Sequence, residues 1–113
     1  MSSKLLTATP LTAEAFKPFG DVFEPNANEP LNINEGFTDK YLSGLTFDFG
    51  GGQAQCNLYQ SRKKALPITI NKMERHPHSS QAFIPIAKTP FLVVVAPHGE
   101  FDESKVQCFV AKA

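Results

Sequence analysis

The sequence predicts an all-β fold, a sandwich or barrel of short strands with one small helix near the N-terminus. Two observations lead to this class. Several segments alternate apolar and polar residues with the period of two that is typical of strands. Turn residues recur at short intervals, which leaves little room for helices. The length of 113 residues indicates one domain, residues 1–113, with a modest core.

The first predicted element is a short helix within residues 11–20. Thr12 is a suitable N-cap, because its hydroxyl oxygen can accept a hydrogen bond from an N–H group of the first turn. Pro18 and Gly20 then prevent a longer helix.

Strands are predicted for most of the remaining chain. The three glycines at 50–52 join two alternating segments and indicate a hairpin. Pro67 begins another strand, since the first position of a strand tolerates proline. Residues 91–96 are apolar on both faces, which predicts a central strand covered on both sides. The predicted strands are 45–49, 53–60, 67–75, 81–86, 91–96 and 106–111.

Charge and composition exclude several kinds of partner. Eleven basic and eleven acidic residues cancel, so neither a nucleic acid nor an anionic membrane is an expected partner. The longest apolar run, 91–96, is too short to span a bilayer, and no secretory signal is visible. Cys56 and Cys108 show no CxxC spacing, which favours buried thiols in a reducing compartment. We therefore expect a soluble cytoplasmic protein.

The segment "ERHPHSSQAFIP", residues 74–85, gathers polar side chains at the end of a predicted strand. Side chains two residues apart share a face of a strand, which places on one side Ile68, Ile70, Lys72, Glu74 and His76. The two isoleucines mark that side as the inner one. His78 joins it if the extended geometry continues, and the proline between the histidines favours this. The segment is thus predicted to become polar as it nears the rim of a barrel.

Two kinds of chemistry are open to this segment. Imidazoles at i and i+2, here His76 and His78, can chelate a divalent metal with a carboxylate or amide oxygen as third ligand. Without a metal, His76 is a candidate base, Glu74 its orienting partner and Gln81 a group that hydrogen-bonds the substrate. The alternative is that both histidines are rim residues of a surface turn, because a short HxH motif often arises by chance.

The string "ERHPHSSQAFIPI", followed by "FLVVVAP", resembles the core signature of the ureidoglycolate lyases, which belong to the cupin superfamily of small β-barrels. Further similarity follows the family's order and covers nearly the whole chain. It is carried by "LTAEAFKPFGDVFE" (11–24), "NINEGFTDKY" (32–41) and "LPITINKMERHP" (66–77).

This resemblance implies a jelly-roll-like cupin barrel and an enzyme that cleaves (S)-ureidoglycolate to glyoxylate and urea in allantoin and purine breakdown. It also implies a homodimer and, for some members, a divalent metal, nickel in particular. The cupin metal pattern corresponds here to His76, His78 and Gln81. Family members continue through a segment rich in glycine, tryptophan and histidine, whereas this sequence ends at Ala113 and has no tryptophan.

From that departure we expect a truncated chain whose barrel is incomplete at the C-terminus, with metal binding weak or absent. A barrel that lacks strands exposes unpaired edges, so we expect a dimer or higher oligomer. The alternative function is a non-catalytic barrel that binds a metal or small molecule, or an inactive fragment of the lyase.

Asn34, Lys40 and Tyr41 are candidate substrate-binding residues, because a cation and an amide suit a ligand carboxylate. The alternative is a left-handed loop asparagine before Gly36 and a solvated lysine. His98 precedes a glycine after a predicted strand and is interpreted as a turn residue.

Overall fold

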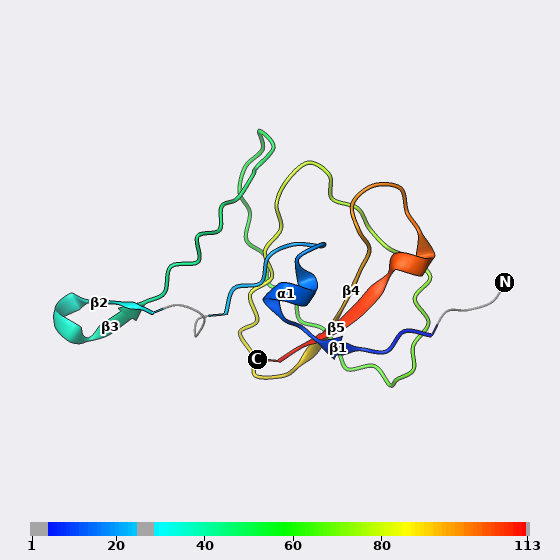
Figure 1. The fold of residues 1–113 in the computed structure, drawn as a ribbon, viewed down its shortest axis with the longest axis horizontal. Coiled ribbons are helices and arrows are strands. Elements are labelled where there is room, and N and C mark those ends of the chain that lie inside the picture. Colours follow the sequence, from blue (N-terminus) through cyan, green and yellow to red (C-terminus); the bar gives the residue numbers. More distant parts are fainter. Residues whose placement is uncertain (1–4, 25–28, 113) are drawn as a thin grey trace. The chain divides into compact units, whose positions relative to one another are not determined.

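A computed structural model describes residues 5–24 and 29–112 of the chain. The chain divides into two compact units, Met1–Leu45 with Ile84–Ala113 and, separately, Thr46–Phe83. All helices and strands of the described residues belong to the first unit (Figure 1). The prediction of a single domain over 1–113 stays a prediction.

The first unit contains a three-stranded sheet in the order β1–β5–β4 (Figure 1). Strands β4 (Phe91–Val95) and β5 (Gln107–Ala111) are antiparallel, and β1 (Thr9–Pro10) pairs with the other side of β5 in parallel. Phe109 lies opposite Val93 of β4 and Thr9 of β1. β5 is therefore the central strand of this sheet.

The core of this unit is centred on Phe109, which is 1% exposed. Its ring meets those of Phe16 and Phe19 edge-on, with centroids 5.4 and 5.8 Å apart. Such aromatic pairs contribute about 0.5–1.5 kcal/mol each beyond the area they bury. The other buried side chains of the described core are Val106, Cys108 and Ala111.

The predicted N-terminal helix is confirmed as α1 (Ala13–Phe16). The Oγ1 atom of Thr12 accepts a hydrogen bond from the Ala15 N–H at 3.1 Å, which is the predicted N-cap. The helix ends within one turn, and the N–H of Gly20 donates to the Phe16 carbonyl at 3.0 Å. The helix places the ring of Phe16 against that of Phe109 on β5.

A second sheet is the hairpin of β2 (Leu31–Ile33) and β3 (Thr38–Lys40), joined by the 3-10 turn η2 (Asn34–Gly36). Asn32 lies opposite Asp39, and its Nδ2 donates to the Asp39 Oδ1 at 2.9 Å. This hairpin is not among the strands predicted from the sequence, because three alternating residues are too short a pattern to stand out. The available signal was an Asn-x-Gly turn between two alternating segments.

Two of the predicted strands are confirmed as β4 and β5, and four are wrong: 45–49, 53–60, 67–75 and 81–86 contain no strand. The central position predicted for 91–96 is also wrong. Among the described residues β4 pairs with β5 alone, and Phe91 and Leu92 are 37% and 40% exposed. The described residues form a β-rich fold without a closed barrel.

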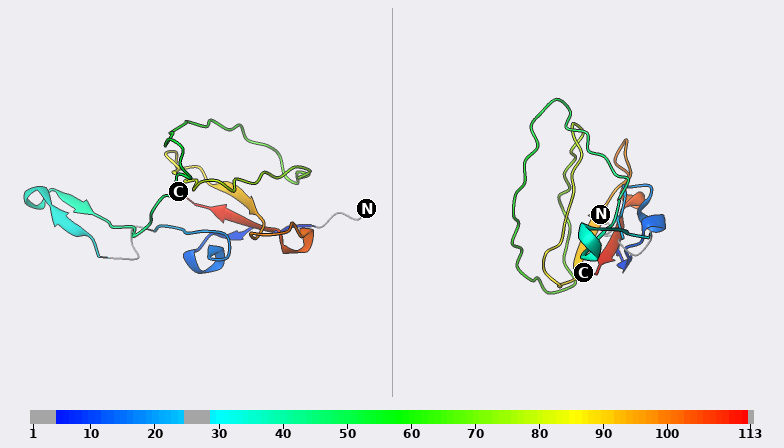
Figure 2. Two further views of the ribbon diagram at one scale, coloured as in Figure 1. Left: turned by 90° about the horizontal axis from the view of Figure 1, so that it is seen from above. Right: turned by 90° about the vertical axis from the view of Figure 1, so that its left-hand side faces the viewer.

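The second unit, Thr46–Phe83, runs without helix or strand (Figure 2). Alternation in a sequence shows which residues share a face, but a strand also needs a neighbouring chain to bond its N–H and C=O groups. Part of the face predicted for residues 45–49 is present, since the rings of Phe47 and Phe49 stack with centroids 6.4 Å apart. A continuous ladder is not formed in this unit.

Candidate active site

The side chains of Glu74 and His76 meet in the second unit. Glu74 Oε2 lies 3.5 Å from His76 Nε2, and the two side chains are 70% and 50% exposed. They share a side as their i, i+2 spacing predicts, although the segment is not a strand. A carboxylate at this distance can orient an imidazole and stabilise its charged form during a proton transfer.

The enclosed face predicted around this pair is not present in the described unit. Ile68 and Ile70, which were expected to mark the inside of a barrel, are 41% and 46% exposed. His78 and Gln81 are exposed as well. The pair of Glu74 and His76 therefore lies at a solvent-accessible surface of its unit.

The described residues contain no group of three His, Cys, Asp or Glu side chains that could hold a metal ion. A catalytic divalent site normally takes three protein ligands, and nickel and zinc prefer imidazole to an amide oxygen. Glu74, His76 and His78 do not form such a group, and the amide of Gln81 would be a poor third ligand for these metals, so the donor set fits them poorly. The assignment of His76 and His78 as ligands stays a prediction.

Hydrogen bonds join the segment that carries these residues to a glycine turn earlier in the unit. The N–H of Ser80 donates to the Asp48 carbonyl at 2.7 Å, and the N–H of Asp48 donates to the Ser80 Oγ at 2.8 Å. A Cβ atom added to Gly50 would overlap the carbonyl of His78. The sequence pattern indicated no role for Asp48 or Ser80, and the glycines at 50–52 were interpreted as the turn of a hairpin.

The candidate substrate-binding residues belong to the other unit. Asn34 has a φ of 54°, which confirms the left-handed conformation, and its Nδ2 donates to the Thr38 Oγ1 at 3.3 Å. Lys40 lies on β3 opposite Leu31, and Tyr41 is 37% exposed. The hairpin thus presents a cation and a phenol at its base, while Asn34 is engaged at its tip.

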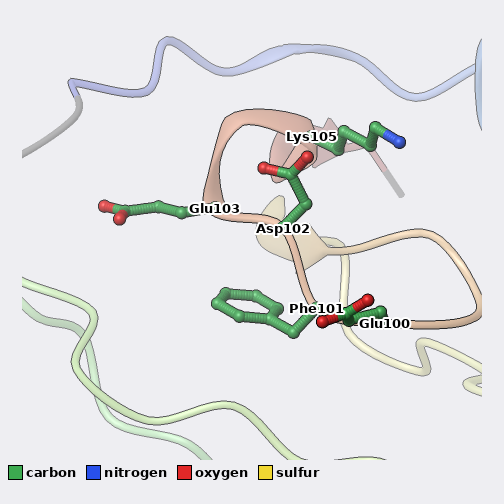
Figure 3. A pocket seen from close by; sticks show the side chains of 5 residues that line it. All are labelled: Glu100, Phe101, Asp102, Glu103 and Lys105. Atoms are coloured by element: carbon green, nitrogen blue, oxygen red, sulfur yellow. The ribbon is translucent and has the colours of Figure 1, made fainter.

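An open hollow of the first unit lies beside the 3-10 turn η3 (Glu103–Lys105). Figure 3 shows its lining side chains, which are Glu100, Phe101, Asp102, Glu103 and Lys105. Asp102 caps the turn, because its Oδ1 accepts from the Ser104 N–H at 3.0 Å. None of the lining residues is a predicted site residue.

The two cysteines differ. Cys108 is buried on β5, and burial raises the pKa of its thiol above the usual 9.0. Cys56 is exposed, so the prediction of a buried thiol is wrong for this residue.

His98 lies in an exposed bend after β4, as predicted. In the described part of the chain, no helix has the length and apolar character needed to cross a bilayer.

Comparison with known proteins identifies the family. The ureidoglycolate lyase family model matches residues 3–113. A ureidoglycolate lyase of Burkholderia mallei (strain NCTC 10229) is 41% identical over 109 residues, which cover 95% of this chain and 64% of the relative. One of Brucella melitensis biotype 2 (strain ATCC 23457) is 41% identical over 114 residues, covering 99% of this chain and 68% of the relative.

A third relative, a ureidoglycolate lyase of Burkholderia cepacia, is 40% identical over 111 residues. This alignment covers 96% of the chain and 63% of the relative. The chain therefore spans somewhat under two thirds of the length of the Burkholderia relatives. The match still runs through both units, including the segment that carries Glu74 and His76. The chain belongs to the ureidoglycolate lyase family.

Proposed function

We propose that this protein is a lyase that cleaves (S)-ureidoglycolate to glyoxylate and urea in allantoin and purine catabolism. The observation that carries the proposal is the family match over residues 3–113, which includes the whole predicted site. The contact between His76 and Glu74 supports it, since the reaction needs a base near neutral pH and that base needs a fixed orientation.

The proposed reaction is a proton transfer coupled to cleavage of a C–N bond. His76 accepts the proton of the carbinol O–H group, and the O–H electron pair forms the C=O bond of glyoxylate. The C–N bond breaks, and its electron pair stays on the ureido nitrogen. That nitrogen receives a proton from the imidazolium of His76 and leaves as urea, so atoms and charge balance. Glu74 orients the imidazole, and Gln81 hydrogen-bonds the substrate.

Recognition of the substrate carboxylate is assigned to the β2–β3 hairpin, with Lys40 as the cation and Asn34 and Tyr41 as hydrogen-bonding groups. Lys40 ends β3, and Tyr41 follows it directly. An ammonium group and a carboxylate form a charge-assisted hydrogen bond, which is stronger than a neutral one. Nickel or another divalent ion, which the family resemblance implies, would be held by His76 and His78. Since the donor set fits it poorly, no step is assigned to it.

The whole protein is proposed to be a cupin-type, jelly-roll-like barrel that acts as a cytoplasmic homodimer. The β-rich first unit supports the fold, and exposed apolar side chains such as Phe83, Ile84 and Ile86, at 73%, 80% and 81%, support association. Light scattering should give a dimer or larger assembly, and a monodisperse monomer would contradict this part of the proposal.

The test of function is product analysis with (S)-ureidoglycolate. The proposal expects glyoxylate and urea in equal amounts, at a rate above spontaneous decay of the substrate. Release of ammonia in place of urea would identify hydrolysis of the ureido group. No glyoxylate above the spontaneous rate would refute catalysis by this chain.

A further inference from the structure

Two stretches of the second unit, the turn at 48–50 and the segment at 78–80, are connected by hydrogen bonds in both directions. Ser80 donates its N–H to the Asp48 carbonyl at 2.7 Å and accepts the Asp48 N–H on its Oγ at 2.8 Å. The Asp48 Oδ1 also accepts the N–H of Gly50 at 2.9 Å, and the Gly52 N–H donates to the Phe49 carbonyl at 2.9 Å, which closes the turn. Ser80 is thus held through both its main chain and its side chain.

Gly50 adds a steric constraint to these hydrogen bonds. Its φ is +57°, and a Cβ at this position would overlap the carbonyl of His78. Gly51 also has a positive φ, +83°, but an added Cβ there would have nothing within 4 Å. Both positions favour glycine by conformation. At Gly50 a side chain is also excluded by contact, because the turn backbone lies directly against His78.

We infer that the 48–50 turn positions the candidate site, with Asp48, Gly50 and Ser80 as positioning residues for the main chain between His76 and Gln81. The inference rests on the proposed function, because it gives the turn a role in the lyase reaction. The site segment has no helix or strand to fix it. Contacts with the turn therefore replace the ladder that would hold the histidines in an ordinary sheet.

The expected effect is on turnover. Displacing a catalytic group by about 1 Å can lower a rate by about 100-fold. Ser80→Ala removes the Oγ acceptor and should lower kcat about ten-fold, whereas Ser80→Thr keeps a hydroxyl and should restore most of it. Gly50→Ala must move the His78 carbonyl and should lower kcat by about 100-fold. KM should change little, since the residues assigned to bind the carboxylate lie on the β2–β3 hairpin.

The matched control is Gly51→Ala. It introduces the same kind of conformational strain as Gly50→Ala but leaves the His78 carbonyl untouched. Gly51→Ala should therefore keep kcat close to that of the wild type when rates are expressed per folded molecule. If backbone strain in the turn were the whole cause of the loss in Gly50→Ala, Gly51→Ala would lower kcat equally. That result would contradict the inference.

A second measurement does not depend on activity. Amide exchange at Asp48 and Ser80 should accelerate in Ser80→Ala and Gly50→Ala, and the imidazole NMR signals of His76 and His78 should shift. Both changes should be absent in Gly51→Ala, and Ser80→Thr should reverse those of Ser80→Ala.

The outcomes separate the two proposals. If the wild type releases no glyoxylate, the proposed function fails, and the imidazole signals still decide whether the turn positions the site. If the wild type is active, the inference is overturned by an unchanged kcat in both Ser80→Ala and Gly50→Ala. Unchanged imidazole signals in these two variants overturn it in either case.

Discussion

The side chains of Glu74 and His76 meet across one intervening residue, with 3.5 Å between Oε2 and Nε2. Both side chains are at least half exposed, so solvent screens the pair and its contribution to stability is small, below about 1 kcal/mol. The proposed role of Glu74 is therefore to orient the imidazole of His76.

Glu74→Gln tests that assignment. We expect kcat/KM to fall by about ten-fold, because the amide cannot stabilise the imidazolium as the carboxylate does. The free energy of unfolding should change by less than about 0.5 kcal/mol. Glu29→Gln, at an exposed position without a proposed role, is the control. Equal activity in the two variants would remove Glu74 from the mechanism.

Phe109 is expected to dominate the stability of the first unit. Phe109→Ala deletes a ring that is 1% exposed and contacts those of Phe16 and Phe19, so the free energy of unfolding should fall by about 3–5 kcal/mol. Phe101→Ala, at a position that is 58% exposed, should cost less than about 1 kcal/mol. Urea denaturation measures both, and similar losses would contradict the assigned core.

Burial of Cys108 predicts a loss of stability at alkaline pH. Its thiol pKa is raised above 9.0 by desolvation, so the unfolded chain loses this proton at a lower pH than the folded one. The stabilisation is complete below about pH 9 and declines as pH rises through the folded-state pKa. In Cys108→Ala the slope of stability against pH should be shallower there. An unchanged slope would show that this thiol is not desolvated.

The metal content of the purified chain is a further prediction. The chain offers His76, His78 and either Gln81 or Glu74. The amide of Gln81 suits nickel or zinc poorly, and Glu74 does not form a ligand group with the two histidines. Elemental analysis should therefore find little or no stoichiometric metal, and any bound ion should exchange. About one tightly held ion per chain would contradict this. His78→Leu would then test the second ligand, and unchanged metal content would exclude His78.

The parts of the fold that could be predicted from the sequence are those set by local chemistry. Thr12 caps α1 through its own side chain, and the apolar runs of β4 and β5 form strands that pair with each other. The left-handed Asn34 was also recognisable from the glycine two residues later. Each of these features depends on a few neighbouring residues.

Partners distant in sequence could not be predicted in the same way. The alternation in 45–49 and 67–75 shows a face but not a pairing chain, and neither segment forms a strand. The bonds between Asp48 and Ser80 join residues that are 32 positions apart, and no local pattern indicates them. At the site, the i, i+2 spacing was enough to predict that Glu74 and His76 share a side, but not that Gly50 lies against His78.

His76 is proposed to be the base of a ureidoglycolate lyase. Its most direct test is glyoxylate release from (S)-ureidoglycolate by wild type, His76→Asn and His98→Asn, the last being an exposed histidine in a bend after β4. We expect a loss of about 100- to 10,000-fold in kcat for His76→Asn, as for removal of a general base, and wild-type turnover for His98→Asn. Wild-type turnover by His76→Asn would contradict it.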